Sequence, residues 1–237
     1  MKTLQLTAAL VVLASLGWAA NRASAAEADG LALAIVYDTS GSMKEQVKDA
    51  NGKSTSKFVI ANRALAAIAQ RVQGFATNTA AGPRRISAGL FVFQGNGARQ
   101  AIPFGPFDAA ALQRWAKAFT SPEGGTPLGN ALTAAAETLL KSGLTRKHIL
   151  IITDGVNTVG PDPAATLPKA RQKAEQQGAP FSVHFVAFDV DANVFAGVKK
   201  LGATVVGAAN ETQLNEQLGF ILEKKILLEE EEAPAKK

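Results

Sequence analysis

Three short polar segments of this sequence carry the residues that could do chemistry, at positions 38–42 (DTSGS), 124–127 (GGTP) and 153–155 (TDG). From these segments, two carboxylates and three hydroxyls form the candidate set, namely Asp38, Ser40, Ser42, Thr126 and Asp154. Carboxylates combined with neutral oxygens suit a hard divalent cation, Mg²⁺ or Mn²⁺ ahead of Ca²⁺. Zinc or copper would favour histidine or cysteine, and the chain has two histidines and no cysteine. The segments therefore predict an oxygen-lined metal site.

Each segment also has an ordinary structural explanation. Asp38 and the two serines could shape a local turn, Thr126-Pro127 is a good helix start, and Asp154-Gly155 is a common turn pair. The combination favours a site instead. Two aspartates that converge repel each other unless a cation lies between them, and the three segments contain no lysine or arginine. Three glycines would let the backbone curl and the loops approach closely, namely Gly41, Gly125 and Gly155.

Apolar runs alternate with helical periodicity along most of the chain. Strands are predicted at 31–37, 86–93, 148–153, 181–188 and 203–206, with a short edge strand at 99–103. Helices are predicted at 57–72, 108–119, 128–141, 163–177, 192–201 and 211–228, with Asp108 and Asp162 as the N-caps of the second and fourth. This alternation predicts one α/β domain over residues 30–228, with a doubly wound, mostly parallel central sheet and helices on both faces. In such sheets ligands bind beyond the carboxyl ends of the strands, where the strand order reverses.

The two ends of the chain are interpreted as lying outside this domain. A positive start, the uncharged apolar run 4–20 and the small residues Ala23-Ser24-Ala25 predict a signal peptide over residues 1–25, with cleavage after Ala25 or Ala26. An uncleaved membrane anchor is the alternative. The charged segment 229–237 is read as a tail. The protein is thus expected to be exported, periplasmic or secreted, with no membrane span after cleavage.

Composition and charge limit the classes of partner that the protein is expected to bind. Apolar residues make up 47% of the chain, enough for a sizeable core. The formal charge of +5 falls to +3 when Lys2 and Arg22 leave with the signal peptide. Because no basic stripe interleaved with aromatic residues is found, nucleic acid is not an expected partner.

Taken as a set, the three polar segments resemble a known family site. DTSGSM after an apolar strand, GGTPL before a helix and TDG after a later strand are similar, in order and spacing, to the metal-ion-dependent adhesion site of von Willebrand factor A (vWA) domains. The resemblance extends over nearly all of the chain after the signal peptide. All five site positions match the family pattern. The sequence is accordingly identified as an exported bacterial-type vWA domain with an intact site.

The resemblance implies a binding mechanism rather than catalysis. Ser40, Ser42 and Thr126 would be hydroxyl ligands, while Asp38 and Asp154 would supply charge, directly or through water. Two carboxylates at most neutralise a divalent ion, so an aspartate or glutamate of a partner protein could complete the ion's shell. The polar stretch 44–56 beside the site is interpreted either as a specificity loop or as a variable surface loop. Asp189 and Asp191 are interpreted as turn residues, with a place at the rim of the site as the alternative.

Two other functions stay open at this point. A magnesium-dependent hydrolase or phosphatase would use Asp38 and Asp154, although phosphatases of the haloacid-dehalogenase type want a second aspartate where this chain has Ser40. A serine hydrolase is disfavoured because no G-x-S-x-G segment is present. The other possibility is a structural vWA domain whose site is unused.

Overall fold

The computed structural model describes residues 27–77 and 84–228 and contains a six-stranded sheet in the order β5-β4-β1-β6-β7-β8. Its strands are β1 (Ala28–Tyr37), β4 (Ile86–Gln94), β5 (Gly97–Pro106), β6 (Leu144–Thr153), β7 (Ser182–Phe188) and β8 (Thr204–Ala208). β5 runs antiparallel to β4, and the other neighbouring strands are parallel. The doubly wound, mostly parallel sheet predicted from the sequence is confirmed.

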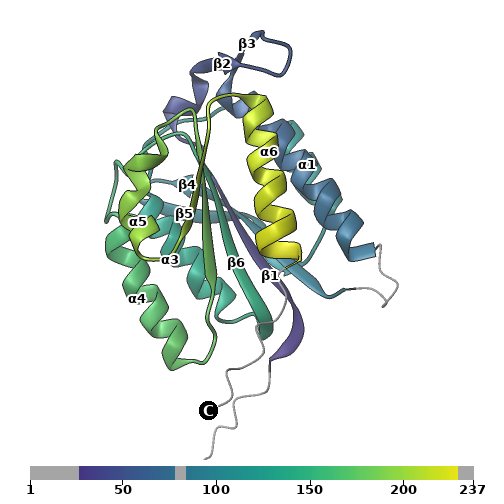
Figure 1. Ribbon diagram of the computed structural model, residues 1–237, viewed down its shortest axis with the longest axis vertical. Coiled ribbons are helices and arrows are strands. Elements are labelled where there is room, and N and C mark those ends of the chain that lie inside the picture. Colours follow the sequence, from purple (N-terminus) through teal and green to yellow (C-terminus); the bar gives the residue numbers. More distant parts are fainter. Residues whose placement is uncertain (1–26, 78–83, 229–237) are drawn as a thin grey trace, which may run out of the picture.

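Helices cover both faces of the sheet (Figure 1). They are α1 (Lys57–Thr77), α2 (Ala109–Ala118), α3 (Leu128–Leu139), α4 (Pro163–Gln176), α5 (Ala196–Lys200) and α6 (Glu211–Ile221). Along β1, Leu31, Leu33 and Ile35 pack with α1, α2 and α6, whereas the alternate residues 32, 34 and 36 pack with α3, α4 and α5. Because successive side chains of a strand point to opposite faces, a strand buried on both faces must be apolar throughout, as β1 is.

Several predicted boundaries change in the structure. The edge strand expected at 99–103 extends over β5, and it tolerates Pro103 because an edge strand needs no ladder donor on its outer side. The helix expected at 192–201 is a 3₁₀ turn, Ala192–Phe195, followed by the short α5. The helix expected at 211–228 is α6 continued by a π-helical segment, Leu222–Leu227. The predicted caps are confirmed: the Asp108 carboxylate accepts from Ala111 N and the Asp162 carboxylate from Ala164 N.

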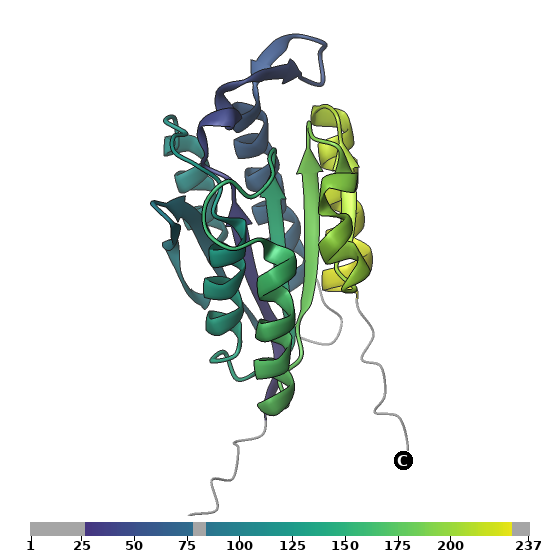
Figure 2. The same cartoon turned by 90° about the vertical axis from the view of Figure 1, so that its left-hand side faces the viewer.

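The polar stretch 44–56 forms structure of its own rather than a loop. A 3₁₀ turn, Gly41–Lys44, leads into a hairpin of β2 (Gln46–Lys48) and β3 (Ser54–Ser56). The hairpin stands above the carboxyl ends of the sheet strands (Figure 2). Asp49 holds its turn by accepting hydrogen bonds from Asn51 N, Lys53 N and Thr55 Oγ1, at 2.9–3.1 Å.

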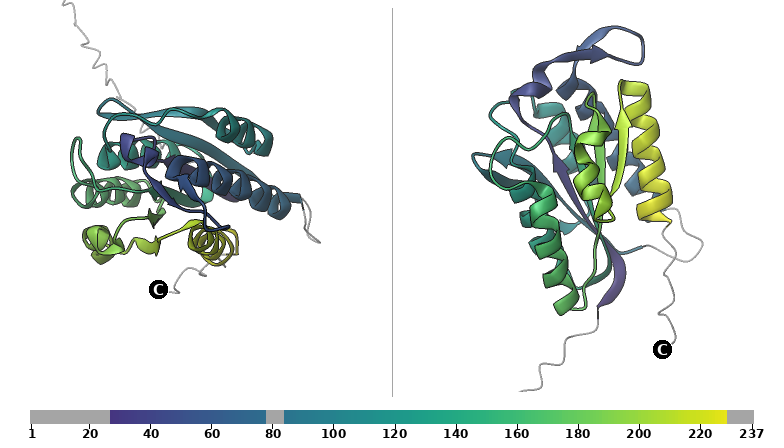
Figure 3. Two further views of the ribbon diagram at one scale, coloured as in Figure 1. Left: turned by 90° about the horizontal axis from the view of Figure 1, so that it is seen from above. Right: turned by 60° about the vertical axis from the view of Figure 1, so that its left-hand side comes forward.

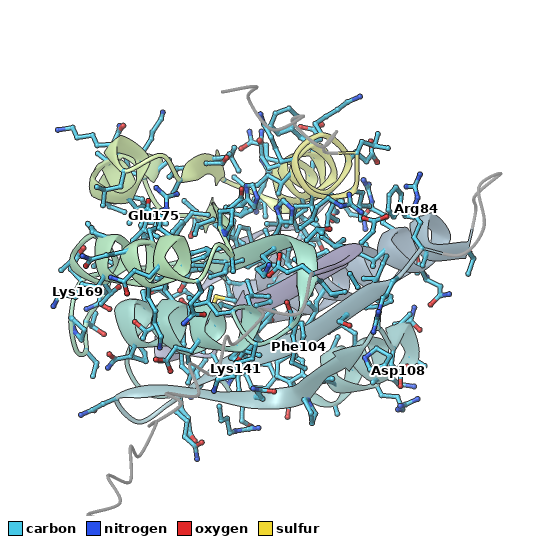
Figure 4. The ribbon with its side chains drawn as sticks, turned by 90° about the horizontal axis from the view of Figure 1, so that it is seen from below. Arg84, Phe104, Asp108, Lys141, Lys169 and Glu175 are labelled. Atoms are coloured by element: carbon cyan, nitrogen blue, oxygen red, sulfur yellow. The ribbon has the colours of Figure 1, made fainter. Side chains whose placement is uncertain are left out.

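The hairpin is also tied to the helices beneath it. Glu211, at the start of α6, accepts a hydrogen bond from Ala50 N at 3.0 Å. The same carboxylate forms an ion pair with the guanidinium of Arg63 in α1, at 3.0 Å. The amino ends of the strands lie at the other end of the molecule, where Lys141 precedes β6 (Figure 4). The hairpin and the strand carboxyl ends therefore share one end of the domain.

The predicted signal peptide, residues 1–25, and the predicted tail, residues 229–237, lie outside the described residues. Within residues 27–77 and 84–228, no helix has the length and apolar character needed to cross a membrane.

Candidate metal centre

The candidate site lies at the middle of the sheet, at the carboxyl ends of the adjacent strands β1 and β6 (Figure 3, left). Asp38 follows β1 directly, and its N–H donates to the carbonyl of Ile152 in β6 at 3.0 Å. Asp154 follows β6 directly. The chain leaves β1 toward β4 on one side and reaches β6 on the other, so this is the point where strand order reverses.

The loop before α3 joins the two strand ends. Gly41 N donates to Gly124 O at 3.0 Å, and Glu123 N donates to Thr39 O at 2.7 Å. A Cβ added at Gly125 would lie 2.5 Å from Val159 Cγ2, so the close approach of this loop to residues 158–159 requires a glycine. The three polar segments of the sequence are thus brought together by backbone contacts.

The site oxygens from the three segments converge. Ser40 Oγ lies 3.0 Å from Ser42 Oγ, and Ser42 Oγ donates to Asp154 Oδ1 at 2.8 Å. Thr126 Oγ1 and Ser42 Oγ would each lie 3.9 Å from a Cβ added at Gly155. The explanation of Thr126 as a helix cap is wrong, because the N-cap of α3 is Pro127 and no side chain caps it.

These spacings suit a divalent ion. Adjacent ligands of an octahedral ion with metal–oxygen distances near 2.1 Å stand about 3 Å apart. The Ser40–Ser42 and Ser42–Asp154 oxygen pairs, at 3.0 and 2.8 Å, have that spacing. Within the described part of the chain, no cluster of three or more His, Cys, Asp or Glu residues is placed to hold a metal. Any ion here would therefore depend on hydroxyls as well as carboxylates.

Asp38 is fully buried, with both carboxylate oxygens occupied. Oδ1 accepts from Ser40 N at 2.8 Å, and Oδ2 accepts from Thr153 Oγ1 at 2.6 Å. Burial, followed by the negative charge of Asp154, raises the pKa of Asp38 from 3.8 to about 6, although these hydrogen bonds lower it. Its anion is thus held at a cost that a nearby cation would relieve. The sequence prediction did not include Thr153, although it directly precedes Asp154.

Sequence reasoning also missed a lysine beside the site. The three segments contain no cation, but α1 supplies one: Lys57 Nζ lies 3.1 Å from Asp154 Oδ2. The same Nζ lies 2.8 Å from Glu45 Oε2 and 3.1 Å from Asp189 Oδ2. Burial alone would lower the pKa of Lys57, but the carboxylates outweigh it and raise the pKa. No spacing in the sequence indicates this contact.

The rim of the site includes one of the two residues interpreted as turn residues. Asp189 adopts a positive φ of 54°, and its carboxylate lies 3.1 Å from Lys57 Nζ, which favours the alternative of a rim residue for Asp189. Asp191 instead caps the 3₁₀ turn after β7, accepting from Asn193 N at 2.9 Å.

The fold and these converging oxygens define a class of protein, a doubly wound α/β domain with a polar site where the strand order reverses. Residues 32–217 match the model of the von Willebrand factor type A domain. The chain belongs to this family. No curated protein sequence matches the chain.

Solved structures share the fold. The PilB minor pilin from Streptococcus sanguinis has a TM-score of 0.59 and 17% identity over 81% of this chain and 60% of its own. The vWF domain of the type V pili tip protein Mfa5 from Porphyromonas gingivalis has a TM-score of 0.57 and 14% identity over 81% and 94%. Proximal thread matrix protein 1 from the mussel byssus, whose metal-ion-dependent adhesion site (MIDAS) motif is occupied by zinc, has a TM-score of 0.57. Its sequence identity is 15% over 84% of this chain and 48% of its own. The chain spans about three fifths of the pilin's length.

Proposed function

We propose that the protein is a binding module that holds a divalent metal, Mg²⁺ or Mn²⁺, and captures an aspartate or glutamate of a partner protein through it. The observation that carries the proposal is the spacing of the Ser40, Ser42 and Asp154 oxygens, at 3.0 and 2.8 Å, where β1 and β6 end. A zinc-occupied MIDAS motif in a mussel protein of the same fold supports it.

The residues divide into two roles in this proposal. Ser40, Ser42 and Thr126 would hold the ion through their hydroxyls, while Asp38 and Asp154 would supply charge and orient water. The ion supplies an electrophilic centre that binds a carboxylate. Asp154 also pairs with Lys57, so the negative charge of Asp154 would be shared between the ion and the lysine. A partner carboxylate would therefore meet an ion whose charge Asp38 and Asp154 neutralise only in part.

The surface beside the site suits an acidic partner. Three lysines of the hairpin region are exposed, Lys44, Lys48 and Lys53. On the other side of the site lies a groove of about 740 Å³ that Thr39 and Gly124 share with Trp115 and Arg99. A partner segment with an acidic residue on the ion, further carboxylates toward the hairpin and an apolar side chain over Trp115 would fit this end of the domain.

The geometry disfavours the hydrolase alternative. A nucleophilic aspartate needs a free oxygen within reach of its substrate. Asp38 is 0% exposed, and both of its oxygens accept hydrogen bonds, from Ser40 N and Thr153 Oγ1. We therefore propose a module without catalysis. We propose further that it acts outside the cytoplasm, as the expected signal peptide and the pilus proteins of similar fold suggest.

Calorimetric titration of the metal-stripped protein with Mg²⁺ and Mn²⁺ tests the proposal. We expect saturable binding near one ion per chain, and loss of that binding in Ser42→Ala. With Mn²⁺ bound, acetate should displace a metal-bound water, which proton relaxation of the solvent detects. Absence of saturable binding would refute the proposal. Ion binding with no effect of acetate on the proton relaxation would favour the alternative that the protein is a structural vWA domain whose site is unused.

A further inference from the structure

The strongest feature that the proposed function leaves unexplained is the buried ammonium of Lys57. Its side chain is 3% exposed and is surrounded by three carboxylates, from Glu45, Asp154 and Asp189, at 2.8–3.1 Å. An ammonium group has three N–H donors, so each can meet one carboxylate. Such an arrangement is a built cation site filled by the protein's own side chain.

One of the three carboxylates belongs to the candidate metal centre. Asp154 presents Oδ1 to Ser42 Oγ and Oδ2 to Lys57 Nζ. The other two stand toward solvent: the side chains of Glu45 and Asp189 are 67% and 37% exposed. Lys57 therefore links the innermost acid of the site to the acids at its rim.

The backbone fixes the lysine in this place. Lys57 is the first residue of α1, and its N–H donates to Glu45 O at 2.8 Å across the base of the β2–β3 hairpin. Glu45 and Lys57 thus close the hairpin through both main chain and side chain. Because the hairpin is in turn held by Glu211 and Arg63, the backbone at the start of α1 is fixed close to Asp154.

The charges give this contact a consequence. Asp38, Asp154, Glu45 and Asp189 would together attract a divalent ion strongly, and an ion so neutralised would attract a partner carboxylate weakly. The ammonium of Lys57 among these acids has the opposite effect on both affinities, that of the site for the ion and that of the ion for a partner carboxylate. It repels the ion, and it leaves the ion more of its positive charge.

We infer that Lys57 is a built-in counter-cation of the metal site, a positioning residue that holds Asp154 in place without metal and weakens metal binding so that the ion stays electrophilic toward an acidic partner. This inference rests on the proposed function. When metal is absent, Lys57 neutralises Asp154 and so stabilises the site. When the ion binds, Asp154 has two counter-charges, the ion and Lys57.

Metal affinity measured on matched variants tests the inference. Calorimetry with Mg²⁺ and Mn²⁺ compares the wild type with Lys57→Gln, which keeps a donor for Asp154 but removes the charge, and with Lys57→Arg, which keeps the charge. Lys173→Gln, which breaks the exposed pair with Glu137, is the distant control. We expect Lys57→Gln to bind the ion at least about tenfold more tightly, since removing a unit charge within a few ångströms of a divalent ion has that effect even at the dielectric constant of water. The other two variants should match the wild type.

Thermal unfolding supplies a second readout. Saturating Mg²⁺ should raise the Tm of Lys57→Gln more than that of the wild type, because a tighter ligand stabilises more. A variant that folds only with Mg²⁺ would also support the inference, because the ion would then replace the lysine. The charge-balanced double variant Lys57→Gln/Glu45→Gln guards against a folding defect. It should bind the ion less tightly than Lys57→Gln, because it also loses an attracting carboxylate. A double variant that stays unfolded even with Mg²⁺ would show Lys57 to be structural and overturn the inference.

The outcomes separate this inference from the proposed function. Wild-type binding with unchanged or weaker binding in folded Lys57→Gln would overturn the inference alone. Binding in Lys57→Gln without binding in the wild type would show that Lys57 excludes the ion, and it would refute both the proposed function and the role inferred for Lys57. Absence of binding in every variant would overturn both.

Discussion

Replacing Asp38 with asparagine should stabilise the metal-free protein while it abolishes metal binding. The introduced amide can keep the local hydrogen bonds. Its oxygen can accept from Ser40 N, and its nitrogen can donate to Thr153 Oγ1, since that hydroxyl has a second acceptor in Gly155 O at 3.1 Å. The variant therefore removes a buried charge at small cost to the surrounding contacts.

The pKa of Asp38 sets the size of the effect. Folding raises this pKa from 3.8 to about 6, so the folded state binds the proton more tightly than the unfolded state. Below the unfolded pKa the carboxyl is protonated in both states and the charge costs nothing. As pH rises through the folded pKa, the stability contributed by the proton is lost. At 1.36 kcal/mol per pKa unit, the full loss is about 3 kcal/mol.

Urea unfolding of the wild type and Asp38→Asn in chelator, between about pH 4 and pH 8, measures this loss. Between about pH 4 and pH 8, the difference in unfolding free energy should grow by about 2.5 kcal/mol in favour of the variant, because a small part of the loss has already occurred at pH 4, and it should level off above about pH 6.5. Asp108→Asn is the matched control, because the exposed cap of α2 keeps its function with asparagine. A difference that stays constant over this range would refute the reasoning.

Four further predictions concern the site and its surroundings. Mg²⁺ should raise the Tm of the wild type, by linkage, and leave Asp154→Asn unchanged in the same thermal scan. Thr126→Ala should weaken Mn²⁺ binding about tenfold or more in calorimetry, with an unchanged circular dichroism spectrum, because one hydroxyl oxygen is lost. The double charge reversal Lys48→Glu/Lys53→Glu should weaken binding of a glutamate-rich peptide several-fold at low salt, by fluorescence anisotropy, whereas Lys141→Glu at the opposite end should not (Figure 4). Gly125→Ala should cost about 1–3 kcal/mol in urea unfolding, because its Cβ would lie 2.5 Å from Val159 Cγ2, whereas exposed Gly74→Ala inside α1 should stabilise.

Much of the fold could be predicted because it follows from local patterns. The apolar runs gave the strands β1, β4, β6 and β7 within a few residues, since a strand buried on both faces must be apolar throughout. The caps Asp108 and Asp162 were readable for the same reason, because each bonds only a few residues away. The hairpin of residues 46–56 was missed. Its strands are three residues each and polar, and the hairpin is held by Asp49 and by contacts with α1 and α6 rather than by a core.

The sequence by itself determined where the site acids stand, because Asp38 and Asp154 directly follow apolar runs that must be buried strands, and parallel strands end at one edge of a sheet. Only the tertiary structure decided what surrounds them. Lys57 reaches Asp154 across 97 residues of chain, and it does so because the crossover that carries α1 sets its first turn over the end of β6. An ion pair of this kind leaves no periodicity in the sequence, since its partners come from separate elements and meet only when those elements pack.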